Sequence, residues 1–119
     1  MKKKLLVVDD SLLMYQKLED ELKDTEFEIV AYAKDGETAV YMYDKFKPDI
    51  VTMDIIMPGM DGIETAQEIL KNNKEAHIIM VSSLGDDDII EQANEIGINQ
   101  FICKPFEREL VLKELRKIK

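Results

Sequence analysis

The sequence predicts an α/β fold, a doubly wound parallel sheet with helices on both faces. Short, continuous apolar runs alternate along the chain with longer stretches in which apolar residues recur every three or four positions. Continuous runs of this kind are typical of strands buried on both faces, and the longer spacing is typical of amphipathic helices. Five such strand–helix pairs follow one another, which favours a five-stranded parallel sheet covered by helices.

The apolar runs give the expected strands in order. They are Leu5–Val8, Phe27–Ala33, Ile50–Met53, His77–Val81 and Phe101–Cys103. The expected helices follow on the spacings Tyr15/Leu18/Leu22, Ala39/Tyr43/Phe46, Ile63/Ala66/Ile69, Ile89/Ala93/Ile96 and Val111/Leu115/Ile118. Turn residues mark the joins, at Asp35-Gly36, Pro48, Pro58-Gly59, Asp61-Gly62, Gly97 and Pro105. With no linker or repeat between these elements, we expect one domain over residues 1–119.

Composition excludes several classes of function. Of the 119 residues 45% are apolar, which argues against disorder. Acids outnumber bases 25 to 16, and the net charge of −9 disfavours non-specific binding to nucleic acid or anionic membrane. No run approaches the ~20 apolar residues that span a bilayer. A single cysteine, Cys103, excludes an internal disulfide and fits a cytoplasmic protein.

Polar residues gather where the predicted strands end. In a doubly wound sheet, ligands bind beyond the carboxyl ends of the strands, at the point where the strand order reverses. The residues at or just beyond these ends are Asp9, Asp10, Asp54, Ser82, Ser83 and Lys104. If their strands are neighbours, three carboxylates, a hydroxyl and an ammonium meet in one cleft.

The charges of this cleft indicate its chemistry. Three carboxylates and one lysine sum to −2, which a divalent cation would neutralise. Carboxylate oxygens favour Mg²⁺ over zinc. A lysine and a hydroxyl are suited to an incoming phosphoryl group. The residues therefore predict a phosphoryl-transfer site whose nucleophile is one of its own carboxylates.

Four segments together resemble the receiver domain of response regulators in bacterial two-component signalling. They are "VVDD" at 7–10, "DIVTMDIIMPGMDG" at 49–62, "VSS" at 81–83 and "KPF" at 104–106. The resemblance covers the whole chain and implies the flavodoxin-like strand order 2-1-3-4-5 and a cis peptide bond between Lys104 and Pro105. "MVSSLG" at 80–85 looks more like chemotaxis-type regulators and the receivers of chemotaxis methylesterases than like transcription factors.

The resemblance implies a phosphoacceptor and a metal site. Asp54 would accept the phosphoryl group from a phosphohistidine of a sensor histidine kinase. Mg²⁺ would be held by Asp9, Asp10, Asp54 and the backbone carbonyl of Ile56. Asp10 would bind the ion directly and Asp9 largely through water.

The resemblance also implies a switch. Lys104 would pair with the phosphoryl oxygens, Ser82 would supply a hydroxyl to them, and Phe101 would swing inward. Ser82 stands where the family most often has Thr and keeps the hydroxyl. Phe101 stands where Tyr is commonest and lacks the phenolic hydrogen bond. A downstream target protein is expected on the face formed by the fourth helix, fifth strand and fifth helix.

The implied function is that of a phosphorylation-activated response regulator, a stand-alone, monomeric chemotaxis-type protein that turns over no substrate beyond its own phosphorylation and dephosphorylation. Two alternatives remain: the protein is a phosphorelay carrier, or it is a receiver domain excised from a longer regulator. A Mg²⁺-dependent aspartyl phosphohydrolase is disfavoured, because Ile56 stands where such enzymes have an acid two residues after the nucleophile. A flavodoxin-like electron carrier would need a hydroxyl- and glycine-rich loop, which "DDSLLMYQ" at 9–16 does not offer.

The remaining polar and aromatic residues are interpreted structurally. Asp10 or Ser11 is expected to cap the first helix, and Asp86 to Asp88 to lie at the start of the fourth. His77 is expected at the surface. Those expected to pack rather than bind a ligand are Tyr32, Tyr41 and Tyr43. Cys103 is expected to be a small apolar residue near the face formed by the fourth helix, fifth strand and fifth helix, and not a nucleophile.

Overall fold

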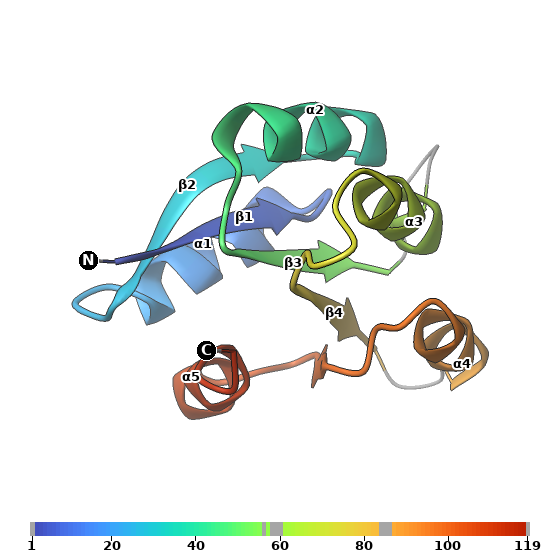
Figure 1. Cartoon of the computed structure of the whole chain (residues 1–119). Coiled ribbons are helices and arrows are strands. Elements are labelled where there is room, and N and C mark those ends of the chain that lie inside the picture. Colours follow the sequence, from blue (N-terminus) through green and yellow to red (C-terminus); the bar gives the residue numbers. More distant parts are fainter. Residues whose placement is uncertain (1, 56, 58–60, 84–86, 119) are drawn as a thin grey trace.

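The computed structural model describes residues 2–55, 57, 61–83 and 87–118. Its strands are β1 (Lys3–Val8), β2 (Phe27–Ala33), β3 (Ile50–Asp54), β4 (Ile78–Ser82) and β5 (Phe101–Cys103). Its helices are α1 (Leu12–Glu21), α2 (Gly36–Phe46), α3 (Gly62–Asn72), α4 (Asp87–Glu95) and α5 (Arg108–Leu115). All the strand pairs are parallel, in the order β2-β1-β3-β4-β5, which confirms the predicted fold (Figure 1).

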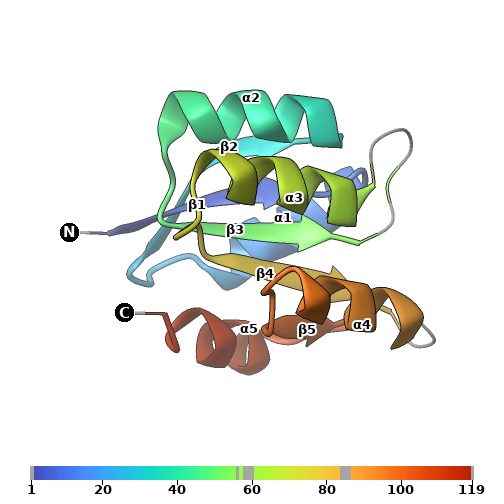
Figure 2. The ribbon, with the colours of Figure 1, turned by 45° about the vertical axis from the view of Figure 1, so that its right-hand side comes forward.

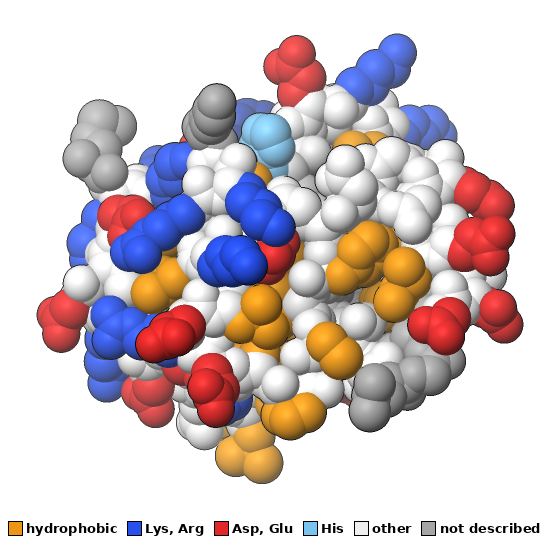
Figure 3. Space-filling view, turned by 90° about the horizontal axis from the view of Figure 1, so that it is seen from below, with side chains coloured by type: hydrophobic (Ala, Val, Ile, Leu, Met, Phe, Trp, Pro, Cys, Tyr) orange, Lys and Arg blue, Asp and Glu red, His pale blue; other side chains and the backbone are white. Residues whose placement is uncertain are grey.

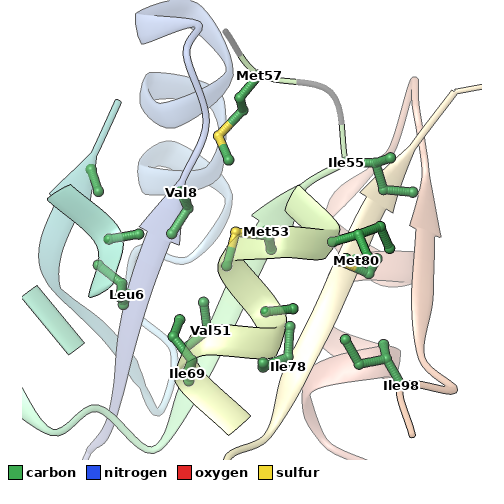
Figure 4. Close-up of a cluster of buried hydrophobic side chains, with 14 of the residues drawn as sticks. Leu6, Val8, Val51, Met53, Ile55, Met57, Ile69, Ile78, Met80 and Ile98 are labelled. Carbon is green, nitrogen blue, oxygen red and sulfur yellow. The ribbon is translucent and has the colours of Figure 1, made fainter. Parts of the chain in front are cut away.

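Helices cover both faces of the sheet, as Figures 1 and 2 show. One apolar cluster joins the sheet to α2, α3 and α4, and the other joins it to α1 and α5. Successive residues of β1 alternate between them, Leu6 and Val8 in the first and Leu5 and Val7 in the second, because neighbouring side chains of a strand point to opposite faces. Figure 4 shows the first cluster, in which Val8 of β1 lies near Met57, just beyond β3.

Four strand boundaries differ slightly from the prediction, and one of them is the start of β4, which lies at Ile78 and not at His77. β1 begins two residues early, because Lys3 pairs with Phe27 and its N–H donates to the Glu26 carbonyl at 2.8 Å. β3 and β4 each continue through one further polar residue, Asp54 and Ser82. Hydrogen bonds between neighbouring strands are made by backbone groups, so they continue past the last apolar side chain. Asp54 and Ser82 therefore both lie within the sheet.

Helix starts are fixed by polar caps. The side chains of Ser11, Asp35 and Asp61 each accept a hydrogen bond from the backbone N–H three residues on. The expected capping at Asp10 or Ser11 is therefore performed by Ser11. Within the described residues, no helix is both long and apolar enough to cross a membrane.

Two aromatic residues of α2 differ from the prediction. Tyr41 is 61% exposed, so interpreting it as a packed residue was wrong. Phe46, which was part of the apolar spacing that predicted the helix, is 38% exposed. Lys45 lies over both rings, with Nζ 5.9 Å from the centroid of Tyr41 and 5.5 Å from that of Phe46, within the range of a cation–π contact.

Candidate functional site

The acidic pair Asp9-Asp10 follows β1 directly, at the carboxyl end of the sheet. Asp9 is only 3% exposed, its backbone N–H donates to the Ala33 carbonyl, and its Oδ1 accepts the Ser11 N–H at 2.9 Å. Asp10 is exposed. The start of α1 thus fixes the Asp9 carboxylate beside the strand, and Asp10 lies next to it on the exposed side of the site.

Asp54 completes the cluster. It is the last residue of β3, which pairs with β1, and it is 8% exposed. One carboxylate oxygen from each of Asp9, Asp10 and Asp54 lies within 4.8 Å of the others. Three carboxylate oxygens at this spacing fit a hard cation such as Mg²⁺, which prefers oxygen ligands. Ile56, whose carbonyl was expected among the ligands, lies outside the described residues.

Lys104 lies between two of these acids. Its Nζ is 3.5 Å from Asp9 Oδ2 and 3.6 Å from Asp54 Oδ2. The Lys104 N–H donates to the Ser82 carbonyl at 2.7 Å, and the peptide bond to Pro105 is cis, as expected. Buried carboxylates are costly unless they are compensated, so the ammonium stabilises both and stands where an anionic group would bind.

The predicted switch residues lie on the next two strands. Ser82 ends β4 and is buried, at 4% exposure. Phe101 begins β5, pairs with Met80, and packs half-buried against the cluster shared with α4. Their movement on phosphorylation stays a prediction.

One neighbour of the site was interpreted in the sequence only as a packing residue. The Tyr32 hydroxyl donates to the Asp9 carbonyl oxygen at 2.9 Å, and its ring stacks on Tyr15 with centroids 4.3 Å apart. Burial, together with the negative charges of Asp9 and Asp10, raises the pKa of Tyr32 above its usual 10.0. No spacing in the sequence indicates this contact.

A second neighbour, Gly62, was interpreted only as part of a turn. Its N–H donates to the Ile55 carbonyl at 2.9 Å. A Cβ added to Gly62 would lie 2.3 Å from the backbone oxygen of Asp54. Only glycine lets α3 begin this close to the strand end that carries Asp54.

The other residues singled out in the sequence lie outside the cluster. His77 is exposed, as expected, and Asp87 and Asp88 lie in the first turn of α4. Cys103 is exposed on β5, the strand of the face where it was expected. Figure 3 shows lysines and arginines mixed with acidic side chains over the left of that view, whereas the charged side chains toward its lower right are acidic.

Comparison with known proteins identifies the class. The chain belongs to the response regulator receiver domain family, whose model matches residues 5–116. It is 44% identical over 114 residues to chemotaxis protein CheY of Listeria monocytogenes, covering 96% of both chains.

Solved structures agree in fold and in sequence. A chain of the CheX–CheY–BeF3–Mg²⁺ complex from Borrelia burgdorferi matches with a TM-score of 0.91 and 36% identity, over 98% of this chain and 88% of that one. The response regulator domain of Thermotoga maritima CheB matches with a TM-score of 0.90 and 35% identity, over 99% of this chain and 96% of that one. The chain is therefore a receiver domain of the type found in CheY response regulators.

Proposed function

We propose that this protein is a phosphorylation-activated response regulator that accepts a phosphoryl group on Asp54 from a sensor histidine kinase. The observation that supports this most is the position of Asp54, with its carboxylate grouped with those of Asp9 and Asp10 and 3.6 Å from the Lys104 ammonium. A nucleophile, a cation site and a fixed positive charge are the parts that phosphoryl transfer to a carboxylate requires.

The proposed transfer forms one bond and breaks one. An Asp54 oxygen attacks the phosphorus, and the P–N bond to the kinase histidine breaks. The imidazole nitrogen keeps the electron pair and takes up a proton. Lys104 pairs with the phosphoryl oxygens, and Ser82 donates its hydroxyl to one of them.

The cation site in this proposal consists of Asp9, Asp10 and Asp54, with the Ile56 carbonyl as a further ligand. When bound, Mg²⁺ supplies positive charge to the phosphoryl oxygens and so opposes their repulsion from the carboxylates. The donor set supports this ion, because it consists of oxygens alone.

The test uses acetyl phosphate with Mg²⁺ and detection of the phosphoryl group by intact mass. Wild type is expected to gain one phosphoryl group and Asp54→Asn none, since the amide lacks the nucleophilic oxygen. Asp44→Asn is the matched control, because Asp44 is exposed on α2 and, among the described residues, forms an ion pair only with Lys47, at 4.0 Å. Labelling of Asp54→Asn at the wild-type rate would refute the proposal.

Phosphorylation is proposed to change the face formed by α4, β5 and α5, where a downstream target protein binds. Support comes from Phe101, which is half-buried at the edge strand and packs against the cluster that includes α4. Backbone NMR shifts on phosphorylation are expected at Phe101 and α4 as well as near Asp54. Shifts confined to the vicinity of Asp54 would contradict this part of the proposal.

The pathway is proposed to be chemotaxis-type signalling by a cytoplasmic monomer, in line with the similarity to chemotaxis proteins. The similarity to the response regulator domain of Thermotoga maritima CheB supports an alternative, in which this receiver serves a longer regulator or a phosphorelay. We propose no substrate turnover, because the position two residues after Asp54 is Ile56 and not an acid. Sustained hydrolysis of a phosphate ester in Mg²⁺ buffer would favour an aspartyl phosphohydrolase instead.

A further inference from the structure

The peptide group between Asp9 and Asp10 is held by a tyrosine from the neighbouring strand. The Tyr32 hydroxyl donates to the Asp9 carbonyl oxygen at 2.9 Å. On the other side of Asp9, the backbone N–H donates to the Ala33 carbonyl at 3.0 Å. Both ends of the Asp9 main chain are therefore tied to the last residues of β2.

The two carboxylates of the acidic pair differ in how they are fixed. Asp9 is buried, and its side chain contacts the Ser11 N–H and the Lys104 ammonium. Asp10 is exposed, and within the described ranges its carboxylate has no hydrogen bond or ion pair. The direction in which Asp10 projects thus depends on the orientation of the peptide group that precedes it.

The Tyr32 ring is itself held in place by α1. It stacks on the Tyr15 ring with centroids 4.3 Å apart and planes inclined by 21°. Tyr15 lies in the first turn of α1, where its N–H donates to the Ser11 carbonyl, and its hydroxyl donates to Glu19 at 3.1 Å. The stack leaves the Tyr32 hydroxyl pointing at the Asp9 carbonyl.

We propose that Tyr32 is a positioning residue of the divalent-cation site: it orients the peptide group between Asp9 and Asp10. The hydroxyl holds the Asp9 carbonyl, and the Asp10 carboxylate is thereby directed toward those of Asp9 and Asp54. This inference rests on the proposed function, since it concerns the same cation site. Loss of a group that orients metal ligands commonly lowers affinity about tenfold or more, so a loss of about tenfold is expected here.

The experiment titrates Mg²⁺ into wild type, Tyr32→Phe and Tyr43→Phe and follows the amide NMR shifts of Asp10 and Asp54. Tyr32→Phe removes the hydroxyl and keeps the stacked ring. Tyr43→Phe is the matched control, because that hydroxyl accepts a hydrogen bond from Asn73 at 3.0 Å, between α2 and α3. We expect Tyr32→Phe to raise the Kd for Mg²⁺ about tenfold and Tyr43→Phe to leave it unchanged.

A second measurement separates positioning from a structural role. The initial rate of phosphorylation by acetyl phosphate is measured against Mg²⁺ concentration for the same three proteins. Tyr32→Phe is expected to raise the half-saturating Mg²⁺ concentration by the same factor and to leave the rate at saturation unchanged. A purely structural role would lower the unfolding temperature and leave the Kd for Mg²⁺ as in wild type.

The outcomes distinguish this inference from the proposed function. If wild type binds Mg²⁺ at Asp10 and Asp54 and Tyr32→Phe binds it equally well, the inference is overturned and the proposed function stands. Equal weakening in Tyr32→Phe and Tyr43→Phe also overturns it. If Mg²⁺ shifts neither amide in wild type, the proposed function fails and the inference fails with it.

Discussion

The buried carboxylates at the end of this sheet share a cationic partner, whereas a buried hydroxyl on β3 has no hydrogen-bond partner among the described residues. Asp9 and Asp54 are buried at the strand ends, and the Lys104 ammonium lies 3.5 Å and 3.6 Å from them. Thr52, two residues before Asp54, is 1% exposed, and its Oγ1 has no hydrogen-bond partner within the described part of the chain. A buried hydroxyl without a partner is destabilising relative to an apolar group of the same shape.

Thr52→Val is therefore expected to leave the free energy of unfolding unchanged or to raise it by up to about 1 kcal/mol. Thr65→Val is the matched control, because the buried Thr65 hydroxyl donates to the Asp61 carbonyl at 2.8 Å. In the control, the free energy of unfolding is expected to fall by about 1 kcal/mol. Chemical unfolding at neutral pH measures the free energy of unfolding of both variants. If Thr52→Val lost as much stability as Thr65→Val, the Thr52 hydroxyl could not be without a hydrogen-bond partner.

At the scale of elements, α3 and β3 are joined through Gly62. The first residue of the helix lies against the backbone of Asp54 and Ile55, with no room for a Cβ. This close packing sets where β3 presents Asp54. The start of α3 therefore contributes to the geometry of the proposed phosphorylation site without supplying a side chain to it.

Gly62→Ala is expected to lower the free energy of unfolding by about 1–3 kcal/mol, because the added methyl forces the helix and strand apart. It is also expected to slow labelling by acetyl phosphate, since the Asp54 backbone must move. Gly97→Ala is the control. Gly97 has φ +95° and no atom near its missing Cβ, so alanine there strains the backbone by about 1–2 kcal/mol without touching the site. Equal labelling rates in the two variants would argue against a role of Gly62 in placing Asp54.

At the scale of the whole molecule, the end of α5 is tied to the start of β2. Arg116 makes two hydrogen bonds to Glu26, Nε to Oε2 at 2.8 Å and Nη2 to Oε1 at 2.9 Å. The hydrogen bonds from Arg116 lower the pKa of Glu26 from its usual 4.5 to about 2. Both side chains are exposed, so the pair contributes little and is weakened by salt.

This pair makes a small, pH-dependent contribution to stability. Because folding lowers the pKa of Glu26, the contribution is fully present above its usual pKa of 4.5 and is lost as the pH falls toward about 2. Glu26→Gln is therefore expected to be less stable than wild type at neutral pH and to approach it in acid. Urea unfolding across this range measures the difference, and a difference that does not change with pH would count against the ion pair.

The sequence by itself determined the elements and the residues at the end of the sheet. Continuous apolar runs and three-to-four-residue spacings depend on the geometry of a single strand or helix, so they can be recognised without knowing the neighbours. β2 and β5 were predicted to the residue. The prediction for β3 missed only Asp54, and the prediction for β4 missed Ser82 and included His77, which lies before the strand. Because parallel strands end at a common edge, the same patterns also placed Asp9, Asp10, Asp54 and Lys104 together.

Only the tertiary structure decided which groups hold that site in shape. Strict alternation from Phe27 would place Tyr32 on the face opposite α1. A register shift in the pairing with β1, where the partner moves from Ile29 to Ala31 between Leu5 and Leu6, instead turns Tyr32 toward α1, Tyr15 and Asp9. The shift depends on how two strands fit against each other and on the helices that cover them. No pattern within either strand encodes it, and the same holds for the contact between Gly62 and the backbone of Asp54.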